Sequence, residues 1–468
     1  MSETGPAPIL GSMRPDGSRL KVHPADLRGR WLSRRRAAFA VLIAFYVLAP
    51  LVPVGGHPSI MLDVQHRRFF LFGQTFNAQD FWMVVLIALA FVFGLLAVTA
   101  WRGRVWCGWA CPQTVFLEGI YRPIERLLEG PRERRLKAAG APWTAGRILR
   151  FGAKQAAFLA VSLLIAHTAA ALFVGPFELA AMIRDGPAAH REAFLLTIGF
   201  AAILTLNFAW FREQFCVVLC PYGRLQSVLH DRDSVTVAYD PRRGEPRGRL
   251  SKAAEGARPL GDCIDCHRCV VVCPTAIDIR NGLQMECLAC LQCVDACDEV
   301  MTKIKRPTGL ILLASQNQLA GERARGLLRP RVLVYGLAFL LVSGTLGASL
   351  ARRTSFEANV LRPRGANPFV VDGALVRNAF EIHLVNKGPA RARFAVEVEA
   401  PVEAEIVIGT PEVELDSLAD ARVPVSVSIA RDRLAEGVEL EVEIEQEESG
   451  EKREIKVRFL APFGAPCK

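Results

Sequence analysis

The chain has 468 residues, 51% of them hydrophobic, and a formal net charge of +10. Its mean hydropathy of +0.23 predicts membrane segments and argues against an ordinary soluble protein. Arginine and lysine gather beside the apolar runs, which is a signal of membrane topology, and we find no DNA- or RNA-binding motif. Thirteen cysteines could fit a secreted disulfide scaffold, but twelve form four compact groups with metal-ligand spacing, and only Cys467 stands apart.

Apolar runs of about 20 residues, the length that a helix needs to cross a bilayer, follow a polar, basic segment at 1–36. We predict five transmembrane helices, four within 37–211 and the fifth at 332–350. The first run has no obvious small-residue cleavage site after it, which favours a retained helix over a signal peptide. The five predicted spans are 37–54, 81–100, 155–174, 193–211 and 332–350. A further amphipathic helix is expected at the membrane interface, at 114–128.

The distribution of basic residues predicts the orientation of these helices. Arginine and lysine are abundant between the second and third spans and scarce in the loops after the first and third. The basic side is cytoplasmic. We therefore expect a protein of the bacterial inner membrane, with its N-terminus and the loop 212–331 in the cytoplasm and residues 351–468 in the periplasm.

Eight cysteines between 263 and 297 form two copies of the spacing C-x2-C-x2-C-x3-C, typical of bacterial two-cluster ferredoxins. We expect a ferredoxin domain at about 255–305 with two 4Fe-4S clusters, each taking three thiolates from one run and the fourth from the other. Paired four-thiolate zinc sites are the alternative. The expected ligands of the first cluster are Cys263, Cys266, Cys269 and Cys297. Those of the second cluster are Cys287, Cys290, Cys293 and Cys273. His267, inside the first run, is expected to be a solvated or hydrogen-bonding loop residue.

Two further cysteine pairs lie at the ends of the second and fourth spans. They are Cys107 and Cys111 in WCGWACP, and Cys216 and Cys220 in FCVVLCP. Residues four apart share one face of a helix, and the proline after each pair disfavours helix at the second cysteine. Thiolates select soft ions such as Cu(I), zinc or an iron-sulfur centre. The two matched pairs therefore predict a metal or redox site, although single buried cysteines are often merely structural.

Histidines outside the cysteine runs give weaker signals. His167 lies within the third span, where an ionisable group is a functional candidate, but an interhelical hydrogen bond is the simpler interpretation. His57 and His66 lie in the outer loop and could take up a metal.

After residue 350, apolar residues recur with period two, as in half-buried strands. About 100 residues of short alternating strands fit an immunoglobulin-like sandwich, whose glutamate-rich faces, such as that of 439–445, would be solvated. The absence of a cofactor motif favours a docking module. The sequence thus predicts a multi-domain protein: a polytopic α-helical membrane domain with an inserted two-cluster ferredoxin domain and a C-terminal immunoglobulin-like β-sandwich.

These motifs together resemble the CcoG/FixG/RdxA family, the membrane-bound accessory proteins of cbb3-type cytochrome c oxidase. The similarity covers LDVQHRRFFLFGQTFNAQDF (62–81), GRVWCGWACPQTVF (103–116), REQFCVVLCPYGRLQS (212–227), DRDSVTVAYDPRRGEPRG (231–248), the ferredoxin insert, CDEVMTKIKRPTGLI (297–311) and NPFVVDGALVRNAFEIHLVNKG (367–388). The chain departs from the usual patterns at Asp298, where free ferredoxins carry proline, and in TKIKRPTG.

The resemblance implies that the protein matures the oxidase by reducing Cu(II) to Cu(I), with oxidase assembly factors or copper chaperones as partners. Cys107, Cys111, Cys216 and Cys220 would then bind copper or lie next to its reduction site. Two alternatives are a quinol-oxidising relay like the NapH and NosR membrane ferredoxins, and an assembly scaffold with structural clusters. The sequence does not indicate the electron donor.

Overall fold

The computed structural model describes residues 21–462, except for 66, 78–79, 250–259, 324, 364, 366, 389 and 435–437. His66, Cys467 and the first 20 residues of the polar N-terminal segment lie outside the described residues. The chain forms two compact units, one ending at Leu346 and the other beginning at Gly347.

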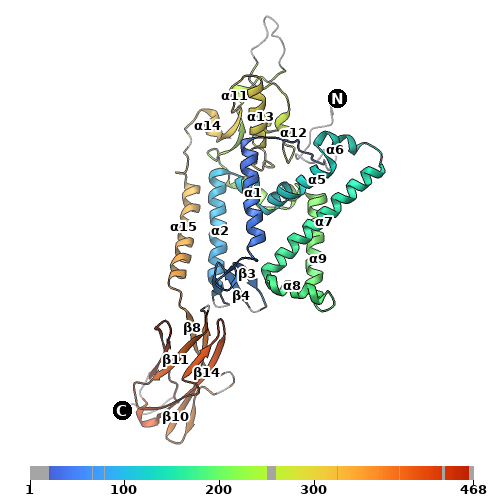
Figure 1. Ribbon diagram of the computed structural model, residues 1–468. Coiled ribbons are helices and arrows are strands. Elements are labelled where there is room, and N and C mark those ends of the chain that lie inside the picture. Colours follow the sequence, from blue (N-terminus) through green and yellow to red (C-terminus); the bar gives the residue numbers. More distant parts are fainter. Residues whose placement is uncertain are drawn as a thin grey trace. The chain divides into compact units, whose positions relative to one another are not determined.

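Four helices of the described chain are long and apolar enough to cross a membrane. They are α2 (Phe81–Arg102), α7 (Ala145–Val174), α9 with its π-helical end η3 (Arg191–Phe211) and α15 (Pro330–Ala351). The last four predicted spans are therefore helical, and α7 begins about ten residues earlier than predicted. Helix α7 packs along α9 (Figure 1). Few side chains of the four helices are buried inside the protein, as expected of surfaces in contact with lipid.

The first predicted span, 37–54, is wrong in its bounds. The helix there, α1, covers Arg30–Leu48 and carries four arginines in its first two turns, so it does not share the apolar composition of the other four. It ends before Pro50, which has no N–H with which to continue the hydrogen-bond ladder. A short hairpin of β1 (Pro53–Val54) and β2 (His57–Pro58) takes the place of the expected last turn.

Helix α1 nevertheless reaches from the ferredoxin part to the far end of the helical layer (Figure 1). At its start, the N–H groups of Trp31 and Leu32 donate to the carboxylate of Asp295, at 3.2 and 2.9 Å. At its end, the Ser59 hydroxyl donates to the carbonyl of Ala49 at 2.7 Å. The 19 residues of α1 span about 28 Å, so this helix crosses the same layer as α2 despite its arginines.

Short helices connect the long ones and carry the cysteine pairs. They are α3 (Val105–Trp109), α4 (Pro112–Phe116), η2 (Leu117–Tyr121), α5 (Arg122–Glu129), α6 (Arg132–Ala139), α8 (Pro176–Asp185), η4 (Phe215–Leu219) and α10 (Pro221–Leu229). The amphipathic helix predicted at 114–128 is confirmed and is built from α4, η2 and α5. Its Glu125 is buried and accepts from both terminal nitrogens of Arg212, at 2.9 and 3.1 Å, and from Arg135 at 3.3 Å.

The ferredoxin part lies between α10 and α15. Strand β6 (Thr236–Tyr239) pairs antiparallel with β7 (Ile311–Ala314), and the two cysteine runs lie between these strands in the sequence. Helices α12 (Arg268–Val271) and α13 (Gln292–Lys303) each begin after the second cysteine of one run. Smaller elements are α11 (Pro241–Gly244), η5 (Ile279–Asn281) and α14 (Gln316–Ala320).

The second unit is a β-sandwich, as predicted. One sheet has the strand order β12-β14-β10-β8, with β9 also paired to β10, and the other has the order β13-β11-β15-β16. The strands are β8 (Phe356–Leu361), β9 (Val370–Asp372), β10 (Leu375–Asn386), β11 (Ala392–Glu399), β12 (Ala404–Ile408), β13 (Glu412–Leu415), β14 (Asp420–Ala430), β15 (Glu439–Gln446) and β16 (Glu451–Arg458). Alternate residues of both sheets form one apolar core.

The glutamate-rich face of β15 is largely neutralised by the neighbouring strand. Lys452 on β16 pairs with Glu443 and Glu445 at 2.7 and 3.0 Å, and Lys456 pairs with Glu441 at 2.9 Å. These residues are the exposed side of a cross-strand ladder, as the alternation in the sequence predicts.

Candidate iron-sulfur and thiol site

The two cysteine runs have the same backbone shape. In each run the residues on either side of the second cysteine have positive φ: Asp265 and His267 at 53°, Ala289 at 51° and Leu291 at 63°. Residues other than glycine rarely adopt this left-handed conformation, and they keep it only where the surroundings impose it. The repeated conformation curls each run around its own cysteines.

The predicted crossed sets of cysteines come together in space. A small cavity is lined by Cys263, Cys266, Cys269 and Cys297. Burial, followed by the charges of Cys269, Asp298, Cys263 and Cys266, raises the pKa of Cys297 to about 12.

The second set gathers around Cys293. Burial, followed by the charges of Cys290, Cys287 and Cys273 and then of Cys269 from the first set, raises the pKa of Cys293 well above its ordinary value. Thiolates in such surroundings need positive charge to balance them, which iron would supply. Within the described chain, no three His, Cys, Asp or Glu side chains converge on a single metal ion. A cubane takes one thiolate on each of its four irons, and each crossed set offers four cysteines for this.

The two membrane cysteine pairs also meet. Burial, followed by the charges of Cys111, Cys107 and Cys220, raises the pKa of Cys216 to about 12. Burial likewise raises the pKa of Cys111, with a smaller contribution from Cys220. The four thiols are therefore electrostatic neighbours, as their matched positions predict.

The local backbone at each pair differs from a continuous helix. Cys107 lies in α3, whereas Cys111 lies after it, in an extended conformation that caps α4. Cys216 lies in the π-helix η4, and Cys220 is the extended cap of α10. The breaks at the second cysteines are confirmed, because Pro112 and Pro221 occupy the first position of the next helix. The expectation that both sulfurs of a pair lie on one α-helical face is wrong for the same reason.

The first cysteine pair lies directly against the second cysteine run. A Cβ atom on Gly108 would lie 2.3 Å from the carbonyl oxygen of Leu288. The indole N–H of Trp109 donates to the carbonyl of Ala289 at 3.2 Å, and the Nε of Arg35 donates to the carbonyl of Gly108 at 2.7 Å. We call this contact of residues 108–109 with residues 288–289 the backbone seam. Sequence reasoning missed it, although a glycine between two cysteines was a signal for a close backbone approach.

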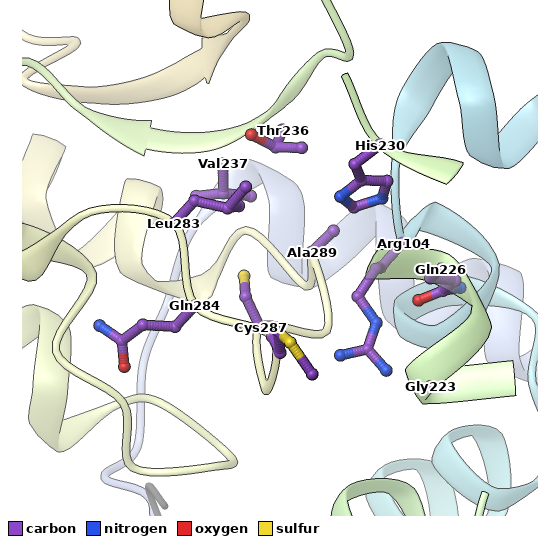
Figure 2. Close-up of a pocket in the computed structure, with 11 residues that line it drawn as sticks. Arg104, Gly223, Gln226, His230, Thr236, Val237, Leu283, Gln284, Cys287 and Ala289 are labelled. Atoms are coloured by element: carbon purple, nitrogen blue, oxygen red, sulfur yellow. The ribbon is translucent and has the colours of Figure 1, made fainter. Parts of the chain in front are cut away.

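A cavity of about 260 Å³ lies beside the seam (Figure 2). Arg104, Gln226 and His230 lie on one side of it, and the segment 283–289, which includes Cys287, lies on the other. The Nε2 of Gln226 also donates to the Cys107 sulfur at 3.5 Å. Sequence reasoning missed these polar residues, because they come from separate segments and belong to no motif.

The histidines singled out in the sequence have local contacts. The ring of His57 stacks on Phe70 with centroids 4.3 Å apart. His167 donates from Nδ1 to the carbonyl of Leu163 in its own helix at 2.7 Å, so the expected interhelical bond is instead intrahelical. His267 contacts Arg280 at 2.9 Å, in agreement with a hydrogen-bonding loop residue.

Comparisons with known proteins agree with this arrangement. A family model described as a 4Fe-4S dicluster domain matches residues 211–316, and one described as a 4Fe-4S binding domain matches 84–131. The model for the Ig-like fold at the C-terminus of FixG matches 346–462. Together with the apolar helices, these matches define a membrane-associated, ferredoxin-type iron-sulfur electron-transfer protein.

Two curated relatives resemble nearly the whole chain. It is 32% identical to the nitrogen fixation protein FixG of Rhizobium meliloti over 96% of this chain and 93% of that protein. It is 36% identical to protein RdxA of Cereibacter sphaeroides over 81% of this chain and 82% of RdxA. The chain belongs to the FixG/RdxA family. A solved structure of a FixG-related protein from Vibrio parahaemolyticus covers 23% of this chain and 97% of its own, at 15% identity and a TM-score of 0.21.

Proposed function

We propose that this protein is a cupric reductase that supplies Cu(I) during assembly of a cbb3-type cytochrome c oxidase. The observation that carries the proposal is the backbone seam, which holds the second cysteine run against the first membrane cysteine pair. The proposed one-electron carriers and the proposed soft-metal ligands would thereby be adjacent.

The eight ferredoxin cysteines are proposed to hold two 4Fe-4S clusters in the crossed sets given above. When bound, such clusters supply one-electron transfer at a potential set by charge, sulfur hydrogen bonds and solvent exposure. The protein contributes the left-handed loop residues that shape both runs, and the seam that fixes the second run in place.

Cu(II) is the proposed substrate, and each ion takes one electron to become Cu(I). Thiolates bind Cu(I) in preference to hard cations, so Cys107, Cys111, Cys216 and Cys220 would favour the reduced product. The two pairs come from separate segments and lie close together, which supports one shared site over two unrelated pairs of structural thiols.

The orientation proposed from the basic loops requires five membrane crossings. The four long apolar helices and α1 together would supply them. The ferredoxin part and the start of α1 lie at the same end of the layer, which is proposed to be the cytoplasmic side of a bacterial inner membrane. The sandwich would then lie in the periplasm and serve as a docking module for oxidase assembly factors or copper chaperones.

The test is anaerobic and uses the full chain with its clusters. The protein is reduced, excess reductant is removed, Cu(II) is added, and cluster reoxidation is followed together with Cu(I) trapped by a chromogenic chelator. We expect about one Cu(I) per electron released. A variant with all four membrane cysteines changed to serine should lose copper binding and most of the rate, whereas Cys467→Ser should not. Clusters that stay reduced in the presence of Cu(II) would rule the proposal out.

A further inference from the structure

The cavity beside the backbone seam has the composition of a ligand site. It is lined by residues from four segments, at 104, 223–230, 236–237 and 283–289 (Figure 2). We propose that this cavity binds the headgroup of a membrane quinol, and that this quinol is the electron donor of the protein. The inference rests on the proposed function. It names the electron donor, which the proposed function leaves unspecified.

The polar side of the cavity needs a partner. Arg104 is only 7% exposed, and in the described part of the chain it forms no ion pair with a carboxylate. Its Nε and the Nε2 of His230 are buried without a hydrogen-bond partner among the described residues. Arg104 also interacts with the Cys107 thiol, but buried polar nitrogens without a hydrogen-bond partner are costly. The two oxygens of a quinol or quinone would pair with such groups, and Gln226 offers a further amide beside them.

The opposite side of the cavity is apolar and open at its rim. Val237 and Ala289 are buried in the wall, whereas Leu283 and Met285 are 47% and 55% exposed. Arg104 comes two residues after the end of α2, so the cavity lies where a membrane helix leaves the lipid. A few convergent polar groups in an apolar pocket are typical of small-molecule sites, and the apolar rim at this depth suits a lipid-soluble ligand.

The position of Cys287 connects the cavity to the proposed redox chemistry. This cysteine lines the cavity and belongs to the second cluster set. Oxidation of one quinol to the quinone releases two electrons and two protons. The two proposed 4Fe-4S clusters would accept one electron each. His230 Nε2 would take up the first proton, and both protons would pass to water. Two Cu(II) ions then take the two electrons one at a time.

Binding is tested first, without copper and without turnover. A photoreactive azidoquinone is added to the full-length protein in lipid nanodiscs, irradiated, and the labelled peptides are identified by mass spectrometry. We expect label in the segments 223–230 and 283–289, and competition by decylubiquinol. Label confined to the outer ends of the membrane helices would overturn the proposal.

Redox coupling is tested next by anaerobic mixing with decylubiquinol and, separately, with menadiol. We expect at least one of these quinols to bleach both clusters. His230→Gln and Arg104→Gln should each raise the quinol concentration for half-maximal reduction by about tenfold, because each removes a hydrogen bond to a buried oxygen. The matched control is Arg102→Gln, which changes an exposed arginine two positions away. Iron content and reduction by dithionite check that each variant is folded and loaded.

The outcomes separate this inference from the proposed function. If neither quinol bleaches the clusters while dithionite-reduced protein still reduces Cu(II), the quinol site is wrong and the cupric reductase stands. If a quinol bleaches the clusters and Cu(II) does not reoxidise them, the quinol site stands and the cupric reductase is wrong. If both variants bleach at the same quinol concentration as Arg102→Gln, the cavity is not the quinol site.

Discussion

The indole N–H of Trp109 donates to the carbonyl of Ala289 at 3.2 Å, across 180 residues of sequence. Trp109 lies between two membrane cysteines, and Ala289 lies between two ferredoxin cysteines. This single bond therefore ties the turn after a membrane helix to a predicted cluster loop. Its neighbour Gly108 sits so close to Leu288 that any larger residue would push the two apart.

Gly108→Ala should disrupt the seam. The added Cβ would lie 2.3 Å from the Leu288 carbonyl oxygen, which is backbone and has no freedom to move aside. Overpacking of this kind costs about 1 to 3 kcal/mol, so we expect a lower melting temperature and slower Cu(II)-driven reoxidation of the clusters. Gly152→Ala on α7 is the matched control, since its new Cβ would meet no atom within 4 Å. Equal behaviour of the two variants would show that the seam is not tight.

Paired cysteine replacements test the crossed ligand sets. Cys263→Ser and Cys297→Ser alter the same predicted cluster and should leave the same remaining EPR signal after reduction. Cys287→Ser and Cys273→Ser should both leave the other signal. In each variant the iron content should fall from about eight atoms toward about four. If Cys297→Ser gave the spectrum of Cys287→Ser, the fourth ligands would be assigned to the wrong runs.

Asp295→Ala should loosen the start of α1. The Asp295 carboxylate accepts from the N–H groups of Trp31 and Leu32 and so caps a helix that lies far away in sequence. Loss of a capping side chain costs about 1 kcal/mol, and we expect faster proteolysis between residues 21 and 36. Glu299→Gln, on the same helix α13, removes only a surface pair with Lys303 and should change proteolysis little.

Glu125 should give the membrane interface a defined acid sensitivity. Burial alone would raise its pKa, but the charge and hydrogen bonds of Arg212, with Lys21 and Arg135, hold the pKa at about 2, below the ordinary 4.5. The stabilisation by Glu125 is therefore fully present above about pH 4.5 and is lost as the pH falls toward 2.

Glu125→Gln tests this dependence through thermal unfolding at several pH values. The variant leaves buried arginines without their anion, so we expect a loss of about 3 to 5 kcal/mol at pH 7. The difference from the unmodified protein should shrink between pH 4.5 and 2. Glu133→Gln on the nearby helix α6 serves as the control. A difference that stays constant down to pH 2 would contradict the assignment.

The sequence was most informative where one local pattern decides the structure. Hydropathy located four long helices, period-two alternation located the sandwich, and cysteine spacing located both ferredoxin runs. Proline predicted the breaks at Cys111 and Cys220. Such features depend on residues close together in the chain.

The sequence was least informative where distant segments meet. The left-handed conformation of Arg212 and its pairing with Glu125 arise from packing between helices. The cavity around Arg104 and His230 is built from four segments. Helix α1 starts within an arginine-rich stretch. This start depends on a carboxylate more than 250 residues away in the sequence. No local period encodes these contacts, so they emerge only from the fold.

The two cysteine runs have one backbone shape but unequal surroundings. In the first run Cys266 is exposed and the solvated His267 lies next to it, whereas Cys290 of the second run is buried. Solvent exposure and nearby charge set the potential of an iron-sulfur cluster. Two copies of one loop would thus differ in their readiness to hold an electron, and this inequality would give the flow of charge through the protein a direction.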